Sequence, residues 1–145
     1  MRRTLRQRTE RKQLMAAEPD VLEELRRLRA RVADVTGALA ATSDGLVLAH
    51  DTATIEPEGV AALTAAALGV SQSLADATSR GAFRELLVRG QNGYVATYAA
   101  GPQAVLTVLA GQRTNIGRLH MEARRSGARI ADLVGGALAR AEHHA

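Results

Sequence analysis

The spacing of apolar positions divides the chain into helical and extended segments. From Asp20 onward, apolar residues recur every three or four positions, which predicts an amphipathic helix with its charged residues, Glu24 among them, in water; the apolar positions are Val21, Leu25, Leu28 and Val32. Asp20 is the expected N-cap, with Glu23 three residues later as in a capping box. Two short apolar runs then flank Thr42-Ser43-Asp44-Gly45. Asp-Gly between such runs predicts a β-hairpin, because both turn positions tolerate positive φ.

A second helix is expected from Pro57 to about Ser79, because proline is tolerated in the first turn and apolar residues then recur at helical spacing. Its apolar surface exceeds the single stripe that covering a sheet requires. This surplus favours contact with a second helix; the alternative is that alanine is simply a good helix former. The Arg80-Gly81 pair is expected to end the helix.

The rest of the sequence predicts an antiparallel meander and a final helix. Turns are expected at Gln91-Asn92-Gly93 and Gly101-Pro102, between strands at residues 83–89, 94–99 and 104–110. The final helix contains several glycines, and a break is expected near Gly127. The predicted order is α-β-β-α-β-β-β-α: a single α/β domain of the α+β type, with one five-stranded antiparallel sheet and helices on both faces.

The net charge of +4 is concentrated at the start of the 145-residue chain. Six cations there face a single acid, Glu10; they are Arg2, Arg3, Arg6, Arg8, Arg11 and Lys12. We therefore expect a basic, disordered tail at residues 1–17, a folded domain at 18–142 and a short C-terminal tail at 143–145. The alternative for the first segment is that the helix from Asp20 continues back through Leu14. A basic segment can bind phosphate backbones or an anionic membrane surface. It has no aromatic residue to stack on bases, so nucleic acid is not the favoured partner.

Composition also bears on compartment and on nucleotide binding. The chain has no cysteine, no run of about 18 apolar residues and no secretory signal pattern, which predicts a cytoplasmic protein without a membrane span. The single lysine, Lys12, follows Arg11 rather than glycine. The chain therefore lacks the lysine of a P-loop nucleotide site.

The remaining chemistry-bearing residues do not form a recognised catalytic or metal motif. Ser43, Asp44, His50 and Asp51 suggest a hydrolase, but the first two belong to the predicted turn and His50 lies a strand away. The histidines are scattered and there is no G-x-G-x-x-G motif, so no metal or cofactor is expected. Two strand tyrosines, Tyr94 and Tyr98, share one side and either line a ligand site or simply pack, the latter being favoured. The sequence thus predicts a non-enzyme.

Three segments together resemble the roadblock (dynein light chain) family. They are ALAATSDGLVL at residues 38–48, the alanine-rich helix from Pro57, and ELLVRGQNGYVATYAA at residues 85–100. The similarity extends from about Asp20 to Leu133 and is closest to bacterial, actinomycete-like members found beside small Ras-like GTPases. It implies the roadblock, profilin-like fold.

The resemblance also implies a function and a contact surface. Family members form homodimers, or dimers with a paralogue, through the middle helix and third strand; the implied interface residues are Val60, Leu63, Ala67, Val70, Leu74, Phe83, Leu86 and Val88. The implied function is that of a dimeric, non-enzymatic module that binds and regulates a small GTPase in bacterial signalling. Arg80, Arg84 and Arg89 are candidate partner contacts, because they lie near this interface. The alternatives are a small-molecule-sensing domain of similar architecture and nucleic-acid binding through the basic tail.

Overall fold

Residues 2–144, which the computed structural model describes, fold into one α+β domain with the predicted element order preceded by an additional helix. The elements are α1 (Arg2–Ala16), α2 (Glu18–Arg31), β1 (Val35–Thr42), β2 (Val47–Asp51), α3 (Pro57–Ala77), β3 (Glu85–Gly90), β4 (Gly93–Ala100), β5 (Ala104–Ala110) and α4 (Ile116–His144). The five strands form one antiparallel sheet in the order β2-β1-β5-β4-β3. The predicted fold class is confirmed.

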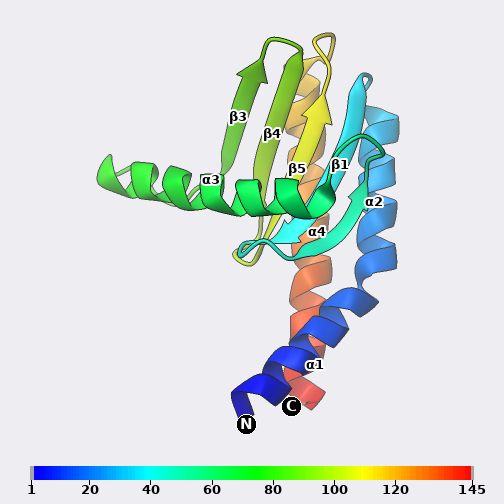
Figure 1. Cartoon of the computed structure of the whole chain (residues 1–145), viewed down its shortest axis with the longest axis vertical. Helices are drawn as coiled ribbons and strands as arrows, with labels where there is room; N and C mark the ends of the chain where they lie inside the picture. Colours follow the sequence, from blue (N-terminus) through cyan, green and yellow to red (C-terminus); the bar gives the residue numbers. More distant parts are fainter. Residues whose placement is uncertain (1, 145) are drawn as a thin grey trace.

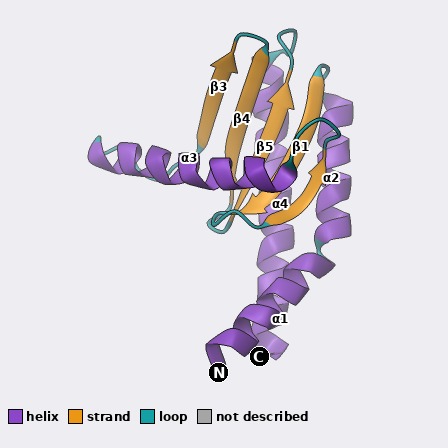
Figure 2. Ribbon diagram, viewed as in Figure 1, coloured by secondary structure: helices purple, strands orange, loops and turns teal. Residues whose placement is uncertain are grey.

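Helices cover both faces of the sheet, as predicted. Figure 1 shows α3 crossing one face and α2 and α4 lying behind the other, and Figure 2 shows the same layers by secondary structure. The main core lies between the sheet and α2 and α4, where Leu25, Leu28, Leu106, Leu119 and Ile130 are fully buried. A smaller core beneath α3 consists of Leu39, Ala41, Ala61 and Val105.

The predicted β1–β2 hairpin is present. Gly45 has φ 99°, a left-handed conformation that glycine adopts without a steric penalty. The Leu46 N–H donates to Thr42 Oγ1 at 2.9 Å, and the Thr42 hydroxyl also bonds the Asp44 carboxylate. Thr42, Ser43 and Asp44 therefore serve the turn, as the sequence indicated.

The first seventeen residues are the largest correction to the sequence-based prediction. Instead of a disordered tail, residues 2–16 form α1, which packs against α4. Leu14 and Ala17 are buried in the main core and hold the helix on the domain. Arginine is itself a good helix former, so a basic composition does not oppose helix formation once an apolar residue provides an anchor.

The start of α2 also differs from the prediction. The N-cap is Ala17 without a side-chain cap, Pro19 occupies the first turn, and Asp20 lies inside the helix. Because α1 leads directly into α2, the Ala17 N–H donates to Gln13 O of α1 at 3.3 Å, Pro19 has no N–H to satisfy, and the Asp20 N–H donates to Ala17 O at 3.1 Å. No capping box is required there.

The final helix is continuous from Ile116 to His144, without the expected break, so His143 belongs to it rather than to a tail. Gly127 is buried where α4 crosses the sheet, and a Cβ placed on it would lie 3.2 Å from the Ala99 carbonyl oxygen. The glycine thus allows close approach of helix and strand. This packing offsets the roughly 1 kcal/mol that glycine costs in a helix.

The meander matches the prediction with small shifts in its strand ends. β3 begins at Glu85, so Phe83 precedes the strand rather than opening it. Gly90 pairs with Gly93, which leaves Gln91 and Asn92 as the two loop residues. Neither has positive φ, so the predicted Asn-Gly turn type is wrong although the loop length is right.

Candidate functional site

The most unusual feature of the surface is the exposure of α3. Only Ala61 and Thr64 of its 21 residues are buried. Among the described residues, α3 is the one helix long and apolar enough to cross a membrane by length and composition, a property not anticipated from the sequence, and 11% of that stretch is buried. An apolar helix left this exposed provides a contact surface for another molecule.

The inner side of α3 accounts for its attachment to the sheet. The helix contacts β1 and β2, and its C-terminal half projects past β3 in Figure 1. Beneath it, Thr107 Oγ1 lies 3.3 Å from Thr64 Oγ1 and 3.1 Å from Thr97 Oγ1. These buried hydroxyls satisfy one another and fix the helix on the sheet.

The row predicted from periodicity is the outward one. Leu63, Val70 and Leu74 are 71%, 70% and 65% exposed, and Ala67 beside them is half-buried. Their spacing places these four on one side of the helix, away from the buried Ala61 and Thr64, whereas Val60 lies at the border and packs against the smaller core beneath α3. The structure therefore brings this row together as one apolar surface.

The neighbouring strand β3 extends this surface. β3 is at the edge of the sheet and pairs only with β4. Val88 is exposed, and Phe83 and Leu86 are half-buried. Leu87 is also exposed, but it was missing from the predicted set because it projects from the opposite sheet face. We call the exposed apolar residues of α3 and of the α3-facing side of β3 the α3–β3 surface; they are Leu63, Val70, Leu74 and Val88.

The two sheet edges differ in how well they are protected. At the β2 edge, Arg29 of α2 donates to the Asp51 carbonyl at 3.2 Å and forms an ion pair with the Asp51 carboxylate at 3.0 Å. Among the described residues, no helix side chain donates a hydrogen bond to a backbone carbonyl of β3 in this way. Edge strands are commonly shielded by charges or by a covering element, and β3 is the less shielded of the two.

The acidic residue at the start of β3 is bound by side chains of α4. Glu85 accepts two hydrogen bonds from Arg124 of α4, at 2.9 and 3.1 Å, and lies 3.2 Å from His120 Nδ1. The same His120 nitrogen is 2.7 Å from the Tyr98 hydroxyl. Burial, reinforced by the Glu85 charge, raises the pKa of Tyr98. Tyr98 thus packs and links β4 to α4 rather than lining a ligand site.

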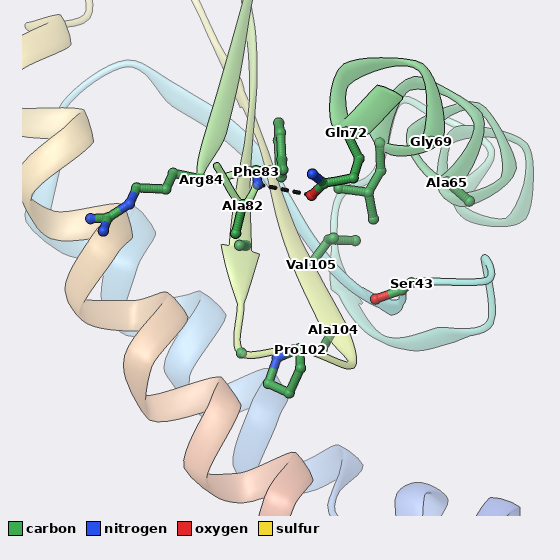
Figure 3. Close-up of a pocket in the computed structure, with 13 residues that line it drawn as sticks. Ser43, Ala65, Gly69, Gln72, Ala82, Phe83, Arg84, Pro102, Ala104 and Val105 are labelled. Carbon is green, nitrogen blue, oxygen red and sulfur yellow. Dashed lines mark hydrogen bonds between the residues drawn. The ribbon is translucent and has the colours of Figure 1, made fainter. Parts of the chain in front are cut away.

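The three candidate arginines lie beside or on the edge strand β3 without converging. Arg80 follows α3, Arg84 precedes β3 and Arg89 is near the end of β3, and all three are exposed. Figure 3 shows the Arg84 side chain directed away from the neighbouring cavity. None forms an ion pair with another described residue. They are available to an acidic partner.

The C-terminal end of α3 is fixed by its backbone and one side chain. Arg80 N–H donates to Ala75 O at 2.8 Å and Ser79 N–H to Asp76 O at 3.2 Å, with Ser79 at φ 57°. This is a Schellman arrangement in which Ser79, not the predicted Gly81, occupies the left-handed position. Gln72 then accepts a 2.9 Å bond from the Phe83 N–H, which joins α3 to the segment before β3.

A cavity of about 550 Å³ lies between α3 and the sheet (Figure 3). Its walls are largely apolar, with Leu68, Phe83 and Val105 among the lining residues. Two of its polar groups come from Ser43 and Gln72, and the Gln72 carbonyl already accepts the Phe83 N–H. Ligand sites usually combine apolar walls with several convergent polar groups. The lining does not favour the small-molecule alternative.

The residues considered for catalysis are not assembled into a site. Ser43 and Asp44 occupy the β1–β2 turn, His50 is exposed on β2, and Asp51 is held by Arg29. Within the described part of the chain, no group of three His, Cys, Asp or Glu residues is placed to hold a metal ion. The geometry defines an interaction domain that exposes an apolar helix beside an open sheet edge.

Comparison with known families identifies the class to which this domain belongs. The Roadblock/LC7 domain matches residues 21–110, and the chain belongs to this family. The resemblance inferred from sequence is confirmed. The matched range lies within the domain predicted at residues 18–142, and membership supports a regulatory or adaptor role based on protein interaction.

Solved structures share the fold at low sequence identity. An MglB with a tetrameric arrangement is 23% identical with a TM-score of 0.77, covering 84% of this chain and 93% of that one. The gliding protein MglB from Thermus thermophilus is 22% identical with a TM-score of 0.75, covering 83% of this chain and 93% of that one. A Roadblock/LC7 domain from Streptomyces avermitilis is 23% identical with a TM-score of 0.70, covering 75% of this chain and 92% of that one. No relative with a curated description matches the chain.

Proposed function

We propose that this chain acts in the cytoplasm as a dimeric, non-enzymatic module that binds and regulates a small Ras-like GTPase. Two copies, or one copy and a paralogue, associate through α3 and β3. The observation that carries the proposal is the exposed α3–β3 surface on an otherwise well-packed domain. Family membership and the fold shared with a tetrameric MglB support self-association or pairing with a paralogue.

The α3–β3 surface has the properties of a contact between copies. A two-fold axis would bring the row of Leu63, Val70 and Leu74 on one protomer against its equivalent, and would place the two open β3 edges side by side. The helix packing would cover apolar side chains while strand pairing satisfies edge backbone groups. One surface then removes both exposed features from water.

The GTPase part of the proposal rests on the family resemblance together with the charge around this surface. Arg80, Arg84 and Arg89 are exposed and without acidic partners among the described residues, so they can pair with carboxylates of a bound protein. The GTPase supplies the nucleotide site, and this chain alters its hydrolysis or holds it in place.

The test is affinity capture of GTPases from the source organism with the intact chain as bait. The lysate is treated with nuclease and divided into samples containing GDP or a non-hydrolysable GTP analogue, and bound proteins are identified by mass spectrometry. We expect enrichment of a small GTPase that depends on the nucleotide. An Arg80→Glu/Arg84→Glu/Arg89→Glu variant, checked for an unchanged oligomeric state, should capture less of it.

Two outcomes contradict the proposal at different points. If the chain is dimeric and captures no GTPase in any nucleotide state, the regulatory role is wrong and the dimer remains. If the chain is monomeric at concentrations well above those used for capture, the α3–β3 interface is wrong. Purified GTPase with and without the chain then gives the direction of regulation from the rate of GTP hydrolysis.

A further inference from the structure

The outward face of α1 carries basic and apolar side chains together. Leu5, Arg8, Lys12 and Met15 follow one another at three, four and three residues, which places them on one side of the helix. Arg11 lies beside this row. All five are exposed, with Leu5 at 60% and Met15 at 42%, a high value for large apolar side chains on a helix that packs against the domain.

The single acid of α1 does not compensate these cations. Glu10 is half-buried on the inner side, where its carboxylate accepts a 3.3 Å hydrogen bond from Arg6. Leu14 on the same inner side is buried against the body of the protein. The inner side therefore holds the helix in place, while Arg8 and Lys12 project from the outer side. Arg11 lies at the border, where it also lines a groove with Asp44 and Glu142.

The outward face of α1 is separate from the α3–β3 surface. In Figure 1, α1 and the C-terminal part of α4 extend beyond the end of the sheet, whereas α3 crosses a sheet face. The main contacts of α1 within the chain are to α4 and α2. A partner on the outward face of α1 therefore does not compete with a second copy of the chain on α3.

We propose that the outward face of α1 docks this protein peripherally on an anionic lipid bilayer. Arginine and lysine near such a surface are attracted by its negative potential, and each strengthens binding about fivefold. Leu5 and Met15, at the two ends of the basic row, enter the headgroup region alongside the cations. Because α4 already holds α1 helical, these side chains are presented without a further ordering cost.

The mixture of side chains favours lipid over nucleic acid as the occupant. Both offer phosphate, and both attract the three cations. Nucleic acid would leave Leu5 and Met15 in water, and α1 has no aromatic residue to stack on exposed bases. A bilayer surface uses the apolar and the basic side chains at once.

The first test measures sedimentation of the full chain with vesicles at about 0.1 M salt. We expect binding to vesicles of phosphatidylcholine containing about one-third phosphatidylserine, and little to phosphatidylcholine alone. Arg8→Gln/Arg11→Gln/Lys12→Gln should weaken binding on the order of a hundredfold. The matched control removes the same charge from exposed positions elsewhere; it is Arg26→Gln/Arg113→Gln/Arg118→Gln, and it should bind nearly as the parent does.

The second test asks whether the α1 face itself enters the bilayer. The chain has no tryptophan, so Leu5→Trp introduces a single fluorophore. Its emission should shift to shorter wavelength with anionic vesicles, while Ala30→Trp, at an exposed position of α2, should not shift. Circular dichroism checks that each variant keeps the parent helix content.

Several results would overturn the proposal. Equal binding to neutral vesicles, equal loss in the two triple variants, or an unshifted Leu5→Trp emission would each exclude docking by this face. Retention of labelled DNA by α1 with no vesicle binding would assign the basic row to nucleic acid. None of these outcomes depends on the GTPase or on the α3–β3 dimer.

Discussion

Leu63→Asp provides the sharpest test of the α3–β3 dimer. Leu63 is 71% exposed, and full burial of a leucine contributes about 1.5–3 kcal/mol, so covering its exposed part in an interface contributes about 1–2 kcal/mol. A two-fold dimer loses this twice, or about 2–4 kcal/mol, before the cost of desolvating two carboxylates. The dissociation constant should therefore rise by at least about 30- to 700-fold. The free energy of unfolding of the monomer should change by no more than about 0.5 kcal/mol, because the Leu63 side chain is exposed there.

The matched control is Ala62→Asp, which adds the same charge one residue earlier. Ala62 is exposed and lies about a third of a turn away from the row that contains Leu63. Sedimentation equilibrium over a range of protein concentrations should give monomers for Leu63→Asp and the parent association for Ala62→Asp. If both variants keep the parent mass, or if both lose it, the assignment of the interface to this row is wrong.

Three further substitutions test the fold. Ser79→Gly should raise the free energy of unfolding by about 1 kcal/mol in urea, because Ser79 holds φ 57°; a decrease would contradict the Schellman assignment. Glu24→Ala should lower the free energy of unfolding by about 2 kcal/mol. This is less than for a fully buried ion pair, because Arg129 is half-exposed, and a change under about 0.5 kcal/mol would refute the assignment. Tyr98→Phe should cost about 1 kcal/mol through the lost bond to His120. Burial raises the pKa of Tyr98 above its value in the unfolded chain. The neutral phenol therefore contributes to the free energy of unfolding below about pH 10, and this contribution declines above it. The phenylalanine variant should lose less stability in alkaline solution than the parent.

Local signals in the sequence predicted the hairpin, the meander and the long helix from Pro57, because each depends on nearby residues. Asp44-Gly45 specifies a turn through backbone geometry, and the two-residue loop at Gln91 and Asn92 has the expected length. Helical periodicity also placed Leu63, Val70 and Leu74 on one side of α3, but periodicity alone does not give which side faces outward, and only the family resemblance implied a partner there. The exposure of Leu87 could not be predicted, since it projects from the far face of an edge strand and no alternation marks it.

Helix α1 could not be predicted from its own residues. Leu14 was the one position that pointed to a longer N-terminal helix, and six cations around it favoured a solvated tail. Its partner is α4, more than a hundred residues away along the chain, and a single anchor becomes meaningful only once that surface exists. Tertiary packing, rather than propensity, determines whether such a segment is ordered.

Periodicity predicts that Glu24 is in water, whereas it is 2% exposed in the structure. The same long-range effect explains this difference. α2 packs against the sheet with one side and against α4 with another, so a residue outside the apolar stripe is buried as well. Ser126 donates to Glu24 at 3.0 Å and Arg129 at 2.9 Å, both from α4. The hydrogen bond to the Glu24 carboxylate raises the pKa of Arg129. The polar seam fixes α4 on α2, and α4 in turn carries α1, so the position of the basic outward face depends on a carboxylate that sequence patterning would assign to solvent.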